Sequence, residues 1–277
     1  MADFETMSTE EYKEMKDKER NEVFEMLSDS TQKLMNKEEF IKYLDLQAQF
    51  FTQTTSNVLL IKEQRPEAAW IKTADEWNKH GIFINKGEKG IKVLRAKSYQ
   101  KSDGSIGTGF EVGKVFDIKQ TSAADRPIST REYPDLLESL MHRAPCMVAV
   151  LIDVPDGGNA CYDHDQEVIF VKEGLGKEEC FLALARELSC CEFMNMDYSK
   201  TREEVLPFAE CSAYMLAKKY GLEVPAPDVS GLIEHFSGKE EKEVRKELSD
   251  TKQVAAILSS RIMDHQRSIQ EEINAGR

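Results

Sequence analysis

The sequence has no long hydrophobic run. Its longest charge-free apolar stretch extends from Ala144 to Ile152, far short of the roughly 20 residues that a membrane-spanning helix needs. The first residues, Met1 to Glu5, include two acidic side chains and lack the basic and apolar segments of a secretory signal. We therefore expect a cytoplasmic protein without a membrane partner.

Cysteine and histidine are scarce, with six and five residues among 277. In the cytoplasm the thiols are expected to be reduced, so we predict small core side chains or metal ligands rather than disulfides. At about 100–200 residues per domain, the length predicts one large domain or two ordinary ones.

Basic residues are in the minority, with 37 Lys and Arg against 50 Asp and Glu and a net charge of −13. This total argues against a surface that binds phosphates everywhere. The charge is uneven, however. Residues 1–50 hold seven basic and thirteen acidic side chains, whereas residues 51–120 hold twelve basic and eight acidic ones, a net charge of +4. A basic module set between acidic segments remains able to bind a polyanion.

Helix starts are indicated by capping boxes, in which a Ser, Thr or Asn is followed three residues later by Glu. Four such pairs occur: Ser8 with Glu11, Asn36 with Glu39, Thr73 with Glu76, and Thr201 with Glu204. The first two predict helices of about 18 and 15 residues. Strand-like runs follow at 91–94 and 110–116, and a polar stretch at 121–131 predicts a linker.

The second half of the sequence predicts a helix at 134–143, a strand at 147–152, and a hairpin-like pair around 160–162 and 168–171. Two long helices are expected at 177–194 and 202–220. An apolar stripe from Val244 to Ile273 then predicts a helix that packs on the protein body or on a partner helix. The predicted fold class is α+β: a small helix-plus-β N-terminal domain, a zincin-like helix and hairpin domain, and a C-terminal helical extension.

The strongest chemical signal lies in the first of those long helices. A zinc peptidase carries His-Glu-x-x-His, whose ligands lie about 40° apart on one helix face with the Glu as general base. Here Arg186 stands in the first ligand place, Glu187 in the base place and Cys190 in the second ligand place. Glu210, on the next helix, stands where a third, carboxylate ligand is expected.

Over most of residues 40–225 the sequence resembles the ArdC antirestriction family and the related LtrC-like proteins of bacterial conjugative elements. The N-terminal resemblance rests on Asn57-Val58-Leu59-Leu60-Ile61, Trp70, Trp77, Lys86-Gly87-Glu88-Lys89-Gly90-Ile91 and Val115-Phe116-Asp117-Ile118-Lys119-Gln120-Thr121. The C-terminal resemblance rests on Cys161-Tyr162-Asp163, Val168-Ile169-Phe170-Val171 and the helices of Arg186 and Glu210.

This resemblance implies a single-stranded-DNA-binding domain joined to a metallopeptidase-like domain. We accordingly predict an acidic helical region at 1–50, an ArdC-like DNA-binding domain at 51–122, a degenerate metallopeptidase-like domain at 130–225 and a helical extension at 226–277. The resemblance further implies protection of incoming DNA from restriction during conjugation of a mobile genetic element.

Two interpretations of the altered motif remain open. Arginine keeps its proton and has no lone pair, so Arg186 cannot bind zinc. Cys190 and Glu210 alone fall below the three protein ligands of catalytic zinc sites. We favour a pseudo-peptidase without a cofactor, in which Arg186 occupies the cation position beside a vestigial Glu187. The alternative is a zinc peptidase that recruits a further ligand from Cys191, Cys211 or His164.

Single-stranded DNA is held by a basic groove and by aromatic rings on which bases stack. The predicted DNA-binding residues are Lys72, Trp77, Lys86, Lys89, Lys92 and Arg95, with Trp70, Phe83 and Phe110 as further aromatic candidates. The two tryptophans also fit the core of a small domain. A rival prediction is an acidic interaction protein that binds no DNA and contacts a protein partner through its N- or C-terminal helices.

Overall fold

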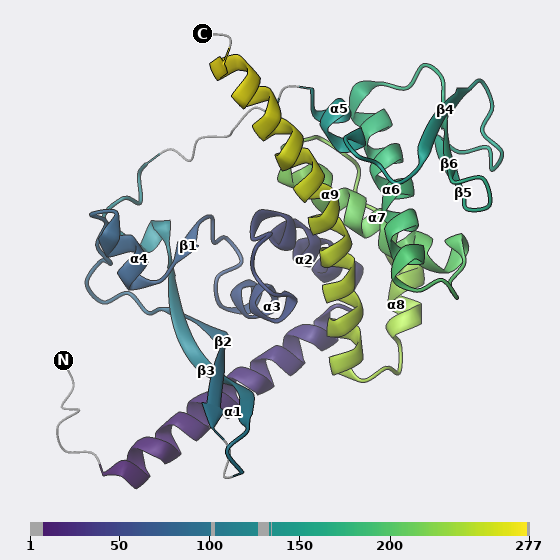
Figure 1. Ribbon diagram of the computed structural model, residues 1–277. Helices are drawn as coiled ribbons and strands as arrows, with labels where there is room; N and C mark the ends of the chain where they lie inside the picture. The colour runs from purple at the N-terminus through teal and green to yellow at the C-terminus, as the bar shows by residue number, and fades with distance from the viewer. Residues whose placement is uncertain (1–7, 101–102, 127–132, 134, 276–277) are drawn as a thin grey trace. The chain divides into compact units, whose positions relative to one another are not determined.

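The computed structural model describes residues 8–100, 103–126, 133 and 135–275 (Figure 1). The chain divides into two compact units, which are described separately. The first comprises Met1–Lys33 and Ser56–Pro127, and the second comprises Leu34–Thr55 and Ile128–Arg277. Within the described residues, no helix has both the length and the apolar character to cross a membrane.

The first unit contains helix α1 (Thr9–Lys33), most of α3 (Thr55–Gln64), the short helix α4 (Ala74–Lys79) and a three-stranded sheet. The strands are β1 (Ile71–Lys72), β2 (Ile91–Gln100) and β3 (Ile106–Asp117), and a 3₁₀ turn, η2 (Ile118–Gln120), follows them. Their order is β1-β3-β2, and both pairings are antiparallel. Strands β2 and β3 extend well beyond the predicted runs. The prediction was too short because the outer halves of the strands are polar or glycine-rich and lack the apolar alternation that indicates a strand.

Two amide side chains of α3 satisfy the free edge of β2. Asn57 Oδ1 accepts from the backbone N–H of Leu94 at 2.8 Å, and Asn57 Nδ2 donates to the Leu94 carbonyl at 3.1 Å. Gln64 does the same for Lys92, with distances of 2.8 Å for both bonds. Because an unpaired strand edge is a template for unwanted pairing, these two side chains both close the edge and fix α3 against the sheet.

Replacing Asn57 and Gln64 together by alanine is expected to lower the free energy of unfolding by about 2–4 kcal/mol. The change leaves four backbone groups of β2 without their partners, and such losses cost about 1–3 kcal/mol for each buried group left unsatisfied, less where water reaches it. Urea denaturation of the full chain measures the change. Asn21, exposed on α1, provides the control, since its alanine variant should stay within about 0.5 kcal/mol. A double variant as stable as that control contradicts the assignment.

Trp77 organises a small core at the end of the sheet. Its side chain is fully buried with Ile82, Ile118 and Ala123, and its indole N–H donates to the Phe116 carbonyl at 2.9 Å. Since Ala123 belongs to this core, the polar stretch predicted as a linker starts inside the folded unit. Its remainder, residues 127–131, lies outside the described residues.

The second unit contains the helices α2 (Lys37–Gln49), α5 (Leu136–Met141), α6 (Lys177–Met196), α7 (Arg202–Lys219), α8 (Ser230–Phe236) and α9 (Glu241–Ala275). Its strands β4 (Met147–Leu151), β5 (Ala160–Asp163) and β6 (Val168–Lys172) form a sheet of order β4-β6-β5. Strand β4 runs parallel to β6, and β5 runs antiparallel to it. Helix α6 packs against β5, β6 and α7, and α7 packs against α2 and α9.

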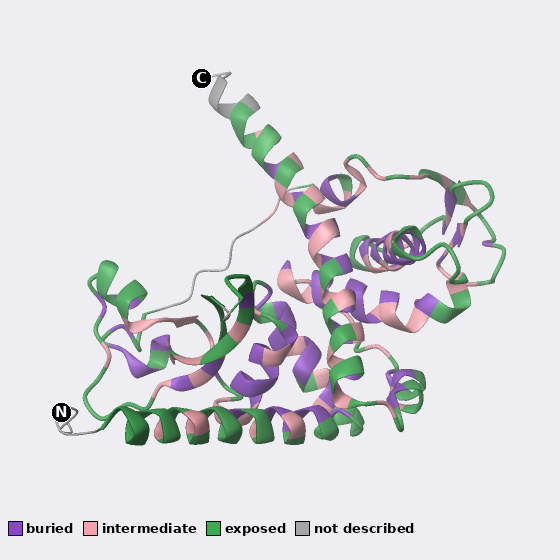
Figure 2. Ribbon diagram, turned by 60° about the horizontal axis from the view of Figure 1, so that its bottom comes forward, coloured by how far each residue is buried: buried purple, intermediate pink, exposed green. Residues whose placement is uncertain are grey.

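The predicted α+β class and the predicted helix starts are confirmed. Reciprocal capping boxes occur at Ser8, Thr73 and Thr201, and Asn36 caps α2 by accepting two backbone N–H bonds. The long helices alternate buried and exposed residues (Figure 2). In α9 the predicted stripe is buried through Val244, Leu248, Val254, Leu258 and Ile262, whereas the Ile273 side chain lies outside the described residues.

Candidate functional site

The residues of the altered zinc motif lie on two adjacent helices of the second unit. Glu187 and Cys190 are fully buried on α6, while Arg186 beside them keeps 23% of its side chain exposed. Glu210 is partly buried on α7. The structure therefore brings together the four residues that the spacing pointed to.

The buried carboxylate of Glu187 is held by two arginines and one backbone amide. Its Oε1 accepts from Arg186 Nε at 2.7 Å and from Arg202 Nη2 at 2.9 Å. Its Oε2 accepts from Arg202 Nε at 2.8 Å and from the N–H of Tyr162 at 2.8 Å. Hydrogen bonds to a charged group are about twice as strong as neutral ones. With both oxygens occupied, Glu187 serves in this arrangement as an anchor rather than as a base facing water.

The same side chains occupy the outer edge of β5. Arg186 Nη2 donates to the Ala160 carbonyl at 2.7 Å, and Glu187 accepts from the next outward-facing group of the strand, the Tyr162 N–H. An extended peptide that adds to a sheet edge forms its main-chain bonds with such groups. Arg186 and Glu187 thus take the positions on β5 that a bound peptide strand needs.

Arg202 joins a third element to this cluster. Its side chain, only 14% exposed, also contacts Asp156 Oδ2 at 3.1 Å from the turn that precedes β5. The two arginines and the two carboxylates balance in charge. The cluster therefore ties α6, the first turn of α7 and the β5 region into one ion-paired network.

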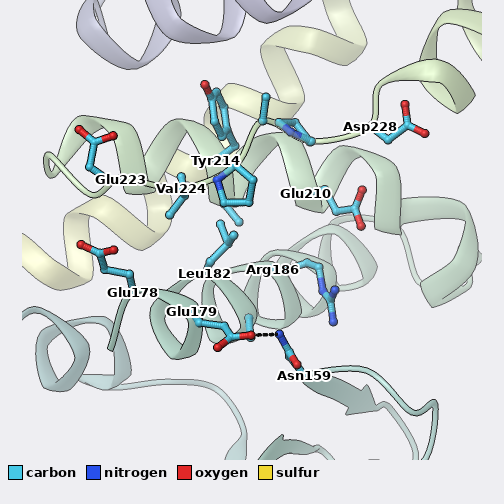
Figure 3. A pocket seen from close by; sticks show the side chains of 15 residues that line it. Asn159, Glu178, Glu179, Leu182, Arg186, Glu210, Tyr214, Glu223, Val224 and Asp228 are labelled. Atoms are coloured by element: carbon cyan, nitrogen blue, oxygen red, sulfur yellow. Dashed lines mark hydrogen bonds between the residues drawn. The ribbon is translucent and has the colours of Figure 1, made fainter. Parts of the chain in front are cut away.

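A cavity of about 540 Å³ lies on the other side of Arg186. Arg186 and Glu210 project toward it from α6 and α7 (Figure 3), and the segment from Glu223 to Asp228 forms its far wall. Burial raises the pKa of Glu210, and the charge of Arg186 offsets only part of this effect. A hydrogen bond from Lys37 lowers the pKa of Asp228 to about 2.

The donor set does not suit a catalytic zinc ion. Burial, reinforced by the charge of Glu187, raises the pKa of the Cys190 thiol well above its ordinary value. Arg186 supplies a cation where the first ligand is expected. In the part of the chain that the structure describes, no three His, Cys, Asp or Glu side chains are placed to share a metal ion, and this includes Cys191, Cys211 and His164.

Some of the predicted DNA-binding residues of the first unit are exposed, whereas others are buried or paired with side chains of the same unit. Trp77 is fully buried, so its ring is not available to a base, and it leaves the candidate set because its indole is a core residue. Trp70 is 45% exposed and packs edge-on against Trp77 with ring centroids 5.3 Å apart. Lys72 Nζ lies 5.0 Å from the Trp70 ring and 2.8 Å from His80 Nε2.

The remaining cations also differ in their surroundings. Lys86 and Lys89 are exposed on the turn around Gly87, a residue with φ +91° that a side chain would strain. Arg95 is exposed on β2. Lys92, in contrast, pairs with Glu22 of α1 at 3.1 Å, so its charge is already partly neutralised within the unit.

Comparison with known proteins identifies a family for the first half of the chain, including residues 34–55 of the second unit. Residues 9–132 match the family described as the N-terminal domain of anti-restriction factor ArdC. This part of the chain is ArdC-like. The family resemblance expected from the sequence is thereby confirmed, while the LtrC-like part of that expectation stays a prediction.

Two solved structures share the fold of this chain. They are the antirestriction ArdC protein from the R388 plasmid in its metal-free form, with a TM-score of 0.54, and in its Mn(II)-bound form, with a TM-score of 0.51. Each is 16% identical; the matches cover 76% and 75% of this chain and 85% and 84% of the other. The covered share exceeds residues 9–132, so the similarity in fold continues into the second half. No curated protein matches the chain.

Sequence reasoning missed the second arginine of the buried cluster, Arg202. Arg202 follows the capping residue Thr201 and looks like an ordinary first-turn residue of α7. Its partner Glu187 lies 15 positions earlier on another helix, and no local pattern links the two. One feature of the sequence could have indicated it. Glu187 was expected on the inward face of its helix, and a buried carboxylate requires compensating positive charge.

Proposed function

We propose that this ArdC-like chain is a single-stranded-DNA-binding antirestriction protein of a mobile genetic element, and that its second unit is a zincin-like, metallopeptidase-like domain that works without a catalytic metal. The DNA-binding part is carried by one observation: the unit that contains most of the ArdC N-terminal domain has both exposed cations and exposed aromatic rings, and Lys72 Nζ lies 5.0 Å from the exposed ring of Trp70. This combination suits phosphates and unpaired bases.

Lys86 and Lys89 are the strongest phosphate candidates. Both side chains are exposed, and among the described residues neither forms an ion pair. Lys72 adds a cation held over Trp70, and Phe83, 62% exposed, adds a second accessible ring. Contacts to phosphates and to the faces of bases do not distinguish one base from another, so we infer binding without strong sequence preference. Because phosphate contacts are electrostatic, the affinity should fall as the salt concentration rises.

The metal-free part of the proposal rests on the clamp around Glu187. Two arginines bind this carboxylate, which in a zinc peptidase faces the metal-bound water as general base. Such a cluster stabilises the fold without activating water. Glu187 is therefore proposed as a vestigial base, and Cys190 and Glu210 as residues of former ligand positions.

Metal analysis tests this part directly. We expect the purified full-length protein, incubated with excess zinc and then dialysed, to retain well under about 0.1 zinc per chain, because three protein ligands are needed for a stable catalytic site. Plasma emission spectrometry gives the stoichiometry, and Glu210→Ala and Glu179→Ala are compared. Zinc near one equivalent that disappears only in Glu210→Ala contradicts the pseudo-peptidase proposal and supports a zinc enzyme.

A further inference from the structure

The outer half of the β2–β3 hairpin presents a polar face outside the core of the first unit. The two strands pair from Ile91 opposite Val115 to Gln100 opposite Ile106. Since residues directly opposite share a face and alternate residues face the same way, Arg95, Lys97 and Tyr99 lie on one face of β2. Beyond Val93 every residue of β2 except Leu94 is exposed, so this face is open.

Two glycines of β3 form the floor of this face. A Cβ placed on Gly113 would lie 2.4 Å from Arg95 Nε, and a Cβ placed on Gly109 would lie 3.3 Å from Tyr99 Cε1. The guanidinium of Arg95 therefore lies over Gly113 of β3, and the phenol ring of Tyr99 lies over Gly109. Neither glycine has a positive φ, so the backbone conformation does not require glycine. Glycine weakens a strand and marks a place where something approaches the backbone closely.

The side chains of this face suit one kind of ligand. Arg95 and Lys97 carry positive charge, and the one acidic residue opposite them, Glu111, pairs with Lys97 at 3.0 Å. Tyr99 is 50% exposed. Among the described residues of the two strands, none on this outer face is aliphatic, which argues against an apolar protein partner. The exposed apolar residues of the hairpin, Ile106 and Phe110, pair with Gln100 and Ala96 and so face the other way.

We propose that Arg95 and Tyr99, lying over Gly113 and Gly109, form a stacking platform for unpaired bases of single-stranded DNA. The proposal rests on the proposed DNA-binding function and specifies where bases, as opposed to phosphates, are held. The ring of Tyr99 offers a face to one base and the planar guanidinium of Arg95 offers a face to the next, with the phosphate between them near Lys97.

The test compares two ligands in fluorescence anisotropy: a labelled oligothymidylate and an abasic oligomer of equal length. Tyr99→Leu still covers Gly109 but has no aromatic face, and we expect its affinity for oligothymidylate to fall at least about fivefold while its affinity for the abasic oligomer is unchanged. Gly113→Ala keeps Arg95 in the chain but displaces its side chain, and it should show the same selective loss. Tyr198→Leu removes a ring of the second unit that is 78% exposed and belongs to no candidate DNA-binding set; it is the matched control and should leave both affinities unchanged.

Each outcome has a separate meaning. Unchanged affinity in Tyr99→Leu, equal loss on both ligands, or the same loss in Tyr198→Leu overturns the platform while DNA binding itself stands. If the unaltered protein binds neither ligand at low salt, the proposed function fails. Thermal melting of each variant confirms that it is folded; for Gly113→Ala we expect a melting temperature at or above that of the parent, since alanine is preferred to glycine in a strand by roughly 0.5–1 kcal/mol.

Discussion

Replacing Glu187 by alanine is expected to lower the free energy of unfolding by about 3–5 kcal/mol, the cost of breaking a buried ion pair by removing one partner. The substitution leaves Arg186 and Arg202, with 23% and 14% of their side chains exposed, facing each other without the carboxylate between them. It also leaves the Tyr162 N–H without its acceptor. Calorimetry should record this as a fall in melting temperature of about 6–20 °C for a unit of this size.

Two further variants show whether the loss comes from unbalanced charge. Glu179→Ala removes an exposed carboxylate of the same helix, which bonds Asn159 at 2.8 Å, and its effect should stay within about 1 kcal/mol. The double variant Glu187→Met and Arg202→Met replaces the pair by apolar side chains and should lose less than Glu187→Ala, because one arginine and one carboxylate of the cluster remain and its net charge stays balanced. If the free energy of unfolding of Glu187→Ala equals that of the Glu179→Ala control, Glu187 does not anchor the fold.

Reversing the charge of Lys86 and Lys89 to glutamate is expected to weaken binding of single-stranded DNA on the order of ten- to a hundredfold at 50 mM salt. If each lysine contacts one phosphate, the slope of log affinity against log salt should also fall by about 1.4, since each contact to a single strand contributes about 0.7. Anisotropy titrations of a labelled oligothymidylate over a salt series measure both quantities.

The control for this experiment carries the same change in net charge elsewhere. Lys172 and Lys200 are exposed in the second unit, and their reversal to glutamate should alter affinity less than about threefold, because neither lysine is among the proposed phosphate contacts. Equal losses in both double variants point to a general charge effect rather than to a site. No detectable binding by the parent protein favours instead an acidic interaction module without DNA.

Much of the fold follows from local patterns in the sequence. The capping pairs at Ser8, Thr73 and Thr201 mark helix starts correctly, because the bonds of a capping box form within four residues. Helix and strand lengths are less accurate. Helix α1 extends to Lys33 and β2 to Gln100, further than predicted. The last residues of both elements are mostly polar and show no apolar period, so the local pattern does not predict them.

The DNA-binding candidates show the limit of composition. A basic, aromatic segment was recognised from the sequence, but Trp77 and Lys92 differ from Trp70 and Lys86 in their surroundings. Trp77 lies in the core, and Lys92 pairs with Glu22, a residue 70 positions away. Burial and ion pairing depend on contacts between distant parts of the chain, and neither is readable from a stretch of neighbouring residues.

By itself, the sequence determined the α+β class, the positions of most elements and one point of chemistry: an arginine at the first ligand place cannot bind zinc, whatever surrounds it. The tertiary structure alone decided what that arginine does. Arg186 shares Glu187 with Arg202 and bonds the edge of β5. The physical reason is that a buried carboxylate must find compensating charge, and the folded chain supplied it from a helix that no local pattern connects to the motif.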